Sequence, residues 1–124
     1  MDEFGTVLGC IDGRSQRKVA DYLHTSFGVP NLDTITTAGA VRHLVDDTEQ
    51  TRTLLANLAI SVDKHGSRQI AVVAHHDCAG NTVPATTQKT QISRAMGRIR
   101  DLYPSAEVIG MWLDAHLIVE RIGR

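Results

Sequence analysis

The sequence has few cysteines and few aromatic residues, and it contains no long apolar run and no basic segment. Its 124 residues include two cysteines, two phenylalanines, two tyrosines and one tryptophan. Two cysteines cannot supply the Cys₄ set of a zinc ribbon. No apolar stretch approaches the roughly 20 residues that are needed to cross a bilayer. Basic residues number 13 against 14 acidic ones, so nucleic acid and anionic membranes are poor candidates for partners.

Signatures for nucleotide binding and for secretion are also missing from the sequence. Gly9, Gly13 and Gly28 do not have the spacing of a dinucleotide-binding or phosphate-binding loop. The N-terminal segment Met-Asp-Glu-Phe-Gly lacks the basic and then apolar composition of a signal peptide. We therefore expect a cytoplasmic protein that has neither a nucleotide cofactor nor a membrane or nucleic-acid partner. With 42% hydrophobic residues and no linker, residues 1–124 are predicted to form a single domain.

Strand-like segments occur at intervals along the chain. The short apolar run Thr6–Cys10 and the threonine-rich segment 31–37 each predict a strand. The run Ile70–Ala74 is apolar without alternation, which is typical of a parallel strand that is covered on both faces. Residues 107–122 predict two further strands that are joined near Asp114.

Between these strands, apolar residues recur at the spacing of helices. The three stripes consist of Val19, Leu23 and Phe27, then Leu54, Leu55, Leu58 and Val62, and finally Ile92, Ala95, Met96, Ile99 and Leu102. Ser15 is predicted to cap the first helix, and Asp47 with Gln50 resembles a capping box before the second. The alternation predicts an α/β fold with a mostly parallel sheet, right-handed crossovers and helices on both faces.

Two short segments concentrate the reactive side chains, and each follows a predicted strand. Cys10, Asp12 and Arg14 follow the first strand, and His75 and Cys78 follow the buried strand at Ile70–Ala74. In open α/β sheets, ligands bind beyond the carboxyl ends of the strands, where the strand order reverses. If these two strands are neighbours, Cys10 faces His75 and Cys78 across such a crevice.

Two thiolates and one imidazole form a donor set that suits zinc. Three protein ligands leave a fourth tetrahedral position for water, which is the arrangement of catalytic zinc sites. An ionised Asp12 could orient the nucleophile at that position, and Arg14 could hold Asp12 ionised and correctly turned. An ordinary ion pair at the end of a strand is the alternative interpretation of Asp12 and Arg14.

Cys10-x-Asp12-x-Arg14 followed by His75-x-x-Cys78 resembles the paired signature of the β-carbonic anhydrases, and the chain is most similar to a small, divergent branch of them. Ala38-Gly39-Ala40 resembles the family's Ala-Gly-Asn segment, and residues 108–122 resemble its closing hairpin. The resemblance implies one Zn²⁺ per chain, with Cys10, His75 and Cys78 as its ligands. It also implies that Asp12 and Arg14 form the catalytic dyad.

The resemblance further implies a sheet of order 2-1-3-4 with an extra C-terminal edge strand, and a homodimer or a larger homo-oligomer. The implied reaction is the reversible hydration of carbon dioxide to bicarbonate by a zinc-bound hydroxide. The chain departs from the family pattern at Gly13, Ala40 and Ala79, where serine, asparagine and glycine are common. The family's pocket glutamine has no evident counterpart in the sequence.

Three other functions remain open from the sequence. The same site could hydrolyse carbonyl sulfide or carbon disulfide, or the chain could be a non-catalytic zinc-binding or regulatory domain. Cys10 could also act as a nucleophile, but the small-phosphatase signature needs arginine six residues later, and position 16 is glutamine. Among the other histidines, His76 is expected to be exposed or to lie beside the ligands. Surface positions are expected for His24, His43, His65 and His116.

Overall fold

The computed structural model of the protein describes residues 3–123 and contains one five-stranded sheet of order β2-β1-β3-β4-β5. The first four strands are parallel, and β5 pairs antiparallel to β4. This order confirms the predicted parallel sheet with an additional C-terminal edge strand. The strands are β1 (Phe4–Gly9), β2 (Asn31–Thr36), β3 (Gln69–His75), β4 (Glu107–Leu113) and β5 (Val119–Ile122).

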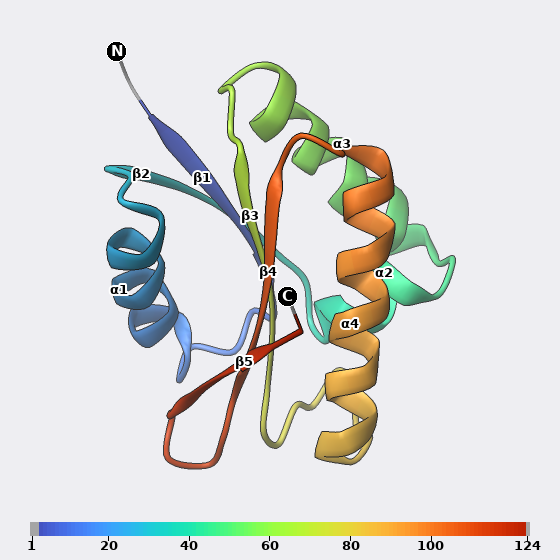
Figure 1. Cartoon of the computed structure of the whole chain (residues 1–124). Helices are drawn as coiled ribbons and strands as arrows, with labels where there is room; N and C mark the ends of the chain where they lie inside the picture. Colours follow the sequence, from blue (N-terminus) through green and yellow to red (C-terminus); the bar gives the residue numbers. More distant parts are fainter. Residues whose placement is uncertain (1–2, 124) are drawn as a thin grey trace.

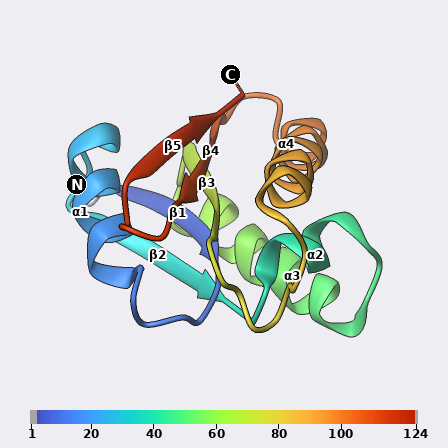
Figure 2. The same cartoon turned by 90° about the horizontal axis from the view of Figure 1, so that it is seen from below.

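Helices cover both faces of the sheet, as the alternation of strands and helices predicted (Figures 1 and 2). On one face lies α1 (Gln16–Phe27), and on the other lie α2 (Ala40–Val45), α3 (Glu49–Asp63) and α4 (Ala85–Leu102). The sequence did not predict α2, because six residues make fewer than two helical turns and leave no repeated apolar stripe.

The central strand β3 separates two hydrophobic cores. Ile70, Val72 and Ala74 point into the core beneath α2, α3 and α4, whereas Ala71 and Val73 point into the core beneath α1. All five side chains are buried, as the unbroken apolar run predicted. The sheet therefore holds the ends of β1 and β3 at fixed positions between two packed layers.

Ser15 occupies the N-cap position of α1, as predicted, whereas the predicted capping box of α3 is wrong. Within the described residues the Ser15 side chain makes no capping hydrogen bond to α1, and its hydroxyl donates instead to the Asp12 carbonyl at 3.3 Å. The capping box of α3 is formed by Thr48 and Thr51, not by Asp47 and Gln50, because the helix begins one residue later than predicted. The Thr48 N–H donates to Thr51 Oγ1 at 2.9 Å.

In residues 3–123, no helix combines the length and the apolarity that a membrane span requires.

His43 is buried in α2, which contradicts its predicted surface position, whereas the other four histidines expected at or near the surface are exposed. Its Nδ1 atom lies 2.7 Å from Thr48 Oγ1. Burial, together with the nearby Arg42, lowers the pKa of His43 below its ordinary value of 6.5. Protonation of His43 therefore favours the unfolded chain.

The free energy of unfolding is expected to fall between pH 8 and pH 5 by more in the wild type than in His43→Gln. The contribution of neutral His43 is complete above pH 6.5 and is lost as the pH falls through the lower pKa of the folded state. Urea unfolding at several pH values measures this difference, with His116→Gln at an exposed position as the control. Equal pH dependence in His43→Gln and wild type would contradict the inference that burial lowers the pKa of His43 in the folded protein.

Candidate metal centre

Two neighbouring parallel strands bring the predicted site residues together. Cys10 follows the last residue of β1, and His75 is the last residue of β3, with Cys78 in the turn beyond it. β1 and β3 are paired in register, so their carboxyl ends lie side by side. β2 pairs on the opposite side of β1 from β3, so the strand order reverses between β1 and β3. The site therefore lies beyond the carboxyl ends of these two strands, as the sequence predicted.

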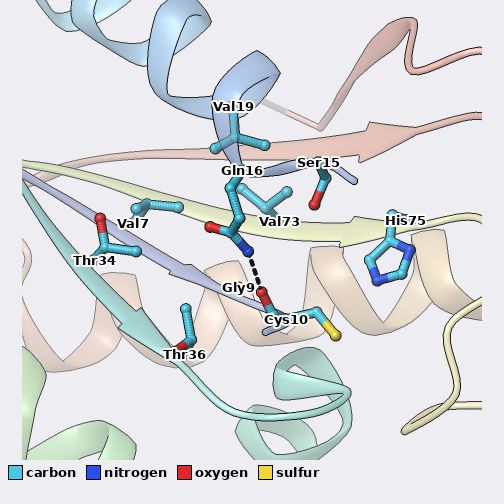
Figure 3. A pocket seen from close by; sticks show the side chains of 10 residues that line it. All are labelled: Val7, Gly9, Cys10, Ser15, Gln16, Val19, Thr34, Thr36, Val73 and His75. Atoms are coloured by element: carbon cyan, nitrogen blue, oxygen red, sulfur yellow. Dashed lines mark hydrogen bonds between the residues drawn. The ribbon is translucent and has the colours of Figure 1, made fainter. Parts of the chain in front are cut away.

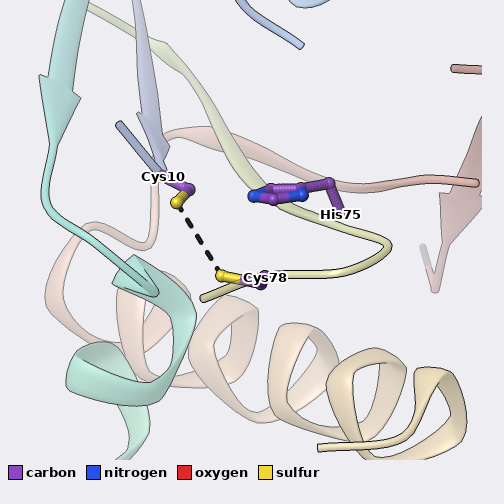
Figure 4. A group of neighbouring side chains, drawn as sticks. All are labelled: Cys10, His75 and Cys78. Atoms are coloured by element: carbon purple, nitrogen blue, oxygen red, sulfur yellow. Dashed lines mark hydrogen bonds between the residues drawn. The ribbon is translucent and has the colours of Figure 1, made fainter. Parts of the chain in front are cut away.

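The three candidate ligands converge on one point (Figure 4). One donor atom from each of Cys10, His75 and Cys78 lies within 4.8 Å of the other two. The two sulfur atoms are 3.8 Å apart, and all three residues are buried. Two cysteines and one histidine in this arrangement match the donor set of three-ligand zinc sites.

The hydrogen bonding of the His75 ring leaves one nitrogen available for a metal. Nδ1 lies 2.8 Å from the His76 carbonyl oxygen, and a carbonyl can only accept, so Nδ1 carries the hydrogen. In the neutral ring Nε2 then has a free lone pair. This atom is buried and has no hydrogen-bond partner among residues 3–123. A buried imidazole nitrogen without a partner, on a ring that faces two thiols, fits a metal ligand.

Hydrogen bonds to Cys10 favour the thiolate form of this residue. Burial acts to raise its pKa, but hydrogen bonds outweigh that effect and lower the pKa below its usual value. The strongest of these bonds comes from the Gly39 N–H, 3.4 Å from Cys10 Sγ. Burial raises the pKa of Cys78, and the nearby Cys10 adds to this rise. A bound cation would favour the thiolate form of both residues.

The Ala38-Gly39-Ala40 segment lies directly against the Cys78 turn. Gly39 is the N-cap residue that precedes α2, and its φ of +62° is a conformation that glycine adopts without strain. A Cβ atom on Gly39 would lie 2.5 Å from the Gly80 carbonyl carbon, and one on Gly80 would lie 2.7 Å from the Gly39 nitrogen. The two backbones therefore touch, which holds the donor N–H of Gly39 beside Cys10.

Asp12 and Arg14 form a two-point ion pair, as predicted. Arg14 Nη2 lies 2.7 Å from Asp12 Oδ2, Arg14 Nε lies 3.1 Å from Oδ1, and the Arg14 backbone N–H donates to Oδ1 at 2.8 Å. These hydrogen bonds hold the pKa of Asp12 at about 2, so the carboxylate is ionised at neutral pH. Arg14 also reaches Asp77, for which the sequence predicted no role, with Nη2 3.1 Å from the Asp77 carbonyl oxygen. Arg14 thus links the segment after β1 to the segment after β3.

Gln16 is a further residue at the site, and the sequence predicted no role for it. It lines a small cavity between α1 and the sheet together with Cys10 and His75 (Figure 3). Its Nε2 donates to the carbonyl oxygens of Cys10 and Asp12 at 2.8 and 2.9 Å. No motif drew attention to this glutamine, because its function depends on the path of the loop rather than on its spacing from other reactive residues.

Comparison with known proteins identifies the family. Residues 1–123 match the family model described as "Putative carbonic anhydrase". The chain belongs to this carbonic anhydrase family. No significant match was found among curated proteins.

Solved carbonic anhydrases share the fold of this family member. The carbonic anhydrase of Streptococcus mutans has a TM-score of 0.64 at 16% identity, covering 95% of this chain and 81% of the other. A structure of tetrameric β-carbonic anhydrases from Sordaria macrospora has a TM-score of 0.67 at 12% identity, covering 100% and 83%. The wild-type β-carbonic anhydrase CafD of Aspergillus fumigatus has a TM-score of 0.63 at 14% identity, covering 94% and 85%. At these identities the likeness establishes the β-carbonic anhydrase fold.

Proposed function

We propose that the protein is a zinc-dependent carbonic anhydrase that catalyses the reversible hydration of carbon dioxide to bicarbonate. The observation that carries the proposal is the convergence of Cys10, His75 and Cys78 at the edge of the sheet where β1 and β3 end. Membership of the carbonic anhydrase family and the β-carbonic anhydrase fold support it.

The three converging residues are proposed to hold one zinc ion per chain. Zinc binds a neutral imidazole nitrogen and a thiolate. The unpartnered His75 Nε2 and the lowered pKa of the Cys10 thiol favour these two forms. Bound zinc would supply a nucleophile at neutral pH by lowering the pKa of a coordinated water.

Asp12 is proposed to orient the attacking group, and Arg14 to hold Asp12 in place. Since the pKa of Asp12 is about 2, its carboxylate stays ionised and acts only as a hydrogen-bond acceptor at neutral pH. Arg14 fixes the carboxylate with three side-chain hydrogen bonds, two from Nε and one from Nη2, and with one backbone hydrogen bond. Its own bond to the Asp77 carbonyl anchors the guanidinium. The carboxylate cannot rotate without breaking these bonds.

The substrate of this reaction is a small molecule, and the protein is proposed to act as a homodimer or a larger homo-oligomer. The relatives from Sordaria macrospora are tetrameric, which supports a homo-oligomeric assembly here. A cytoplasmic location remains a prediction from the sequence.

The proposed role of Asp12 predicts that Asp12→Asn lowers the rate of carbon dioxide hydration by about 100-fold while zinc content is unchanged. Asparagine keeps the size of the side chain but removes the negative charge. The control is Asp77→Asn, which also alters a partner of Arg14 but leaves Asp12 in place. Its rate should stay within a few-fold of the wild type. Stopped-flow hydration assays on protein of known zinc content give both rates.

Equal loss in the two variants would show that Arg14 anchoring matters and that the Asp12 charge does not. Full zinc content with no hydration in the wild type would favour a non-catalytic zinc-binding domain or a sulfur-containing substrate. Assays with carbonyl sulfide and carbon disulfide then separate those two outcomes.

A further inference from the structure

The loop that joins β1 to α1 carries two of the proposed functional residues, Cys10 and Asp12. It begins where the β1 ladder ends at Gly9 and stops where α1 begins at Gln16. Sheet hydrogen bonds therefore do not fix the positions of Cys10 and Asp12. Their relative orientation depends on other contacts, which include those made by side chains within the loop and at its end.

Gln16 makes such a contact to both residues at once. Its side-chain nitrogen lies 2.8 Å from the Cys10 carbonyl oxygen and 2.9 Å from the Asp12 carbonyl oxygen (Figure 3 shows the first of these). Since both partners are carbonyl oxygens, which only accept, the group that faces them is the NH₂ of the amide. Its two hydrogens can serve one carbonyl each.

The base of the Gln16 side chain is itself held in place. Gln16 is the first residue of α1, and that helix packs on the sheet through Val19, Leu23 and Phe27, all of which are buried. The Ser15 carbonyl accepts from the Val19 N–H at 2.9 Å, which ties the end of the loop to the first turn of the helix. Gln16 thus connects a fixed helix to the two loop carbonyls.

We propose that Gln16 is a positioning residue, whose amide ties the carbonyls of Cys10 and Asp12 together and thereby sets the direction of the Cys10 thiol relative to the Asp12 carboxylate. The inference rests on the proposed function, since it gives Cys10 and Asp12 the roles stated there. The carbonyls of Cys10 and Asp12 occupy the amide nitrogen of Gln16, so the positioning role acts through these two residues.

Two substitutions remove the donors of Gln16 while keeping the length of its side chain. Gln16→Met replaces the amide with an apolar group, and Gln16→Glu places a carboxylate against two carbonyl oxygens. A negative charge near a helix N-terminus is favourable, so the glutamate should not weaken α1 itself. Any loss in Gln16→Glu then reflects repulsion of the loop. The matched control is Gln50→Glu, an exposed amide in the first turn of α3.

The test measures cobalt(II) binding as well as activity. Cobalt(II) is titrated into metal-free protein, and its visible absorption bands report the geometry of the thiolate site. We expect the cobalt dissociation constant to rise about 10-fold in Gln16→Met and up to about 100-fold in Gln16→Glu, with shifted bands, which is the range typical of lost partners of metal ligands. At full zinc occupancy, kcat for carbon dioxide hydration should also fall, whereas Gln50→Glu should match the wild type in every measurement.

The outcomes separate this inference from the proposed function. If the wild type binds cobalt and both Gln16 variants bind it equally well, with unchanged bands and kcat, the positioning role is overturned and the metal site stands. If both variants lose their helical circular dichroism, Gln16 is a folding residue and the inference is again overturned. If the wild type itself binds no metal, the proposed function fails and the inference fails with it.

Discussion

His75→Gln is expected to abolish tight zinc binding, whereas His76→Gln, one residue along the chain, is expected to leave it unchanged. The His75 ring is buried, and its Nε2 has no partner within residues 3–123, whereas His76 is exposed. Loss of a ligand should weaken binding by more than the about 10- to 100-fold that follows from losing a partner of a ligand. Zinc per chain after dialysis against a chelator measures the effect.

The pair of variants controls for the loss of an imidazole from this segment. Both carry the same substitution at the end of β3, and circular dichroism should show the wild-type fold in each. Cys78→Ser should behave like His75→Gln, because it removes one of the two sulfur donors. Equal zinc content in His75→Gln and His76→Gln would exclude His75 as a ligand.

Gly39→Ala is expected to destabilise the protein more than Gly28→Ala and to weaken metal binding. Both glycines have a left-handed φ, +62° and +66°, so alanine costs about 1 kcal/mol at either position for backbone strain alone. At Gly28 the methyl group would meet no atom within 4 Å in the described part of the chain, but at Gly39 it would overlap the Gly80 carbonyl group. Overpacking of this kind costs roughly 1–3 kcal/mol more, because the neighbouring backbone must move.

The Gly39 substitution should also affect Cys10. The added methyl group would push the Gly39 segment and the Gly80 turn apart. The Gly39 N–H is then expected to move away from Cys10 Sγ, which removes a hydrogen bond that lowers the pKa of this thiol. Urea unfolding and cobalt titration of both variants measure the two effects. A Gly39→Ala variant as stable as Gly28→Ala, with wild-type metal affinity, would contradict the close contact of the two backbones.

Long apolar patterns and the family motif were sufficient to predict the sheet and the convergence of the candidate ligands. The buried run at Ile70–Ala74 indicated a parallel strand, and the positions of Cys10 and His75 at strand ends placed them at the same edge. Both features depend on which strands are buried and on where each strand ends. A sequence shows these properties through the types of its residues and the spacing of its apolar residues. The metal-binding and catalytic roles of the site residues stay predictions.

The features that the sequence did not reveal depend on contacts between distant segments. The burial of His43 follows from the short helix α2, whose six residues give no period. The hydrogen bonds of Gln16 depend on the path of the loop from β1 to α1. The Gly39–Gly80 contact joins residues from two loops. None of these contacts has a signature in local composition or spacing.

The most direct test of zinc-dependent catalysis by this protein is the rate of carbon dioxide hydration as a function of bound zinc. Metal-free wild-type protein is loaded in steps, the zinc per chain is measured at each step, and the hydration rate is followed by stopped flow. The rate is expected to rise in proportion to bound zinc and to stop rising at one zinc per chain. A protein that holds one zinc per chain and hydrates carbon dioxide no faster than the buffer would contradict this expectation.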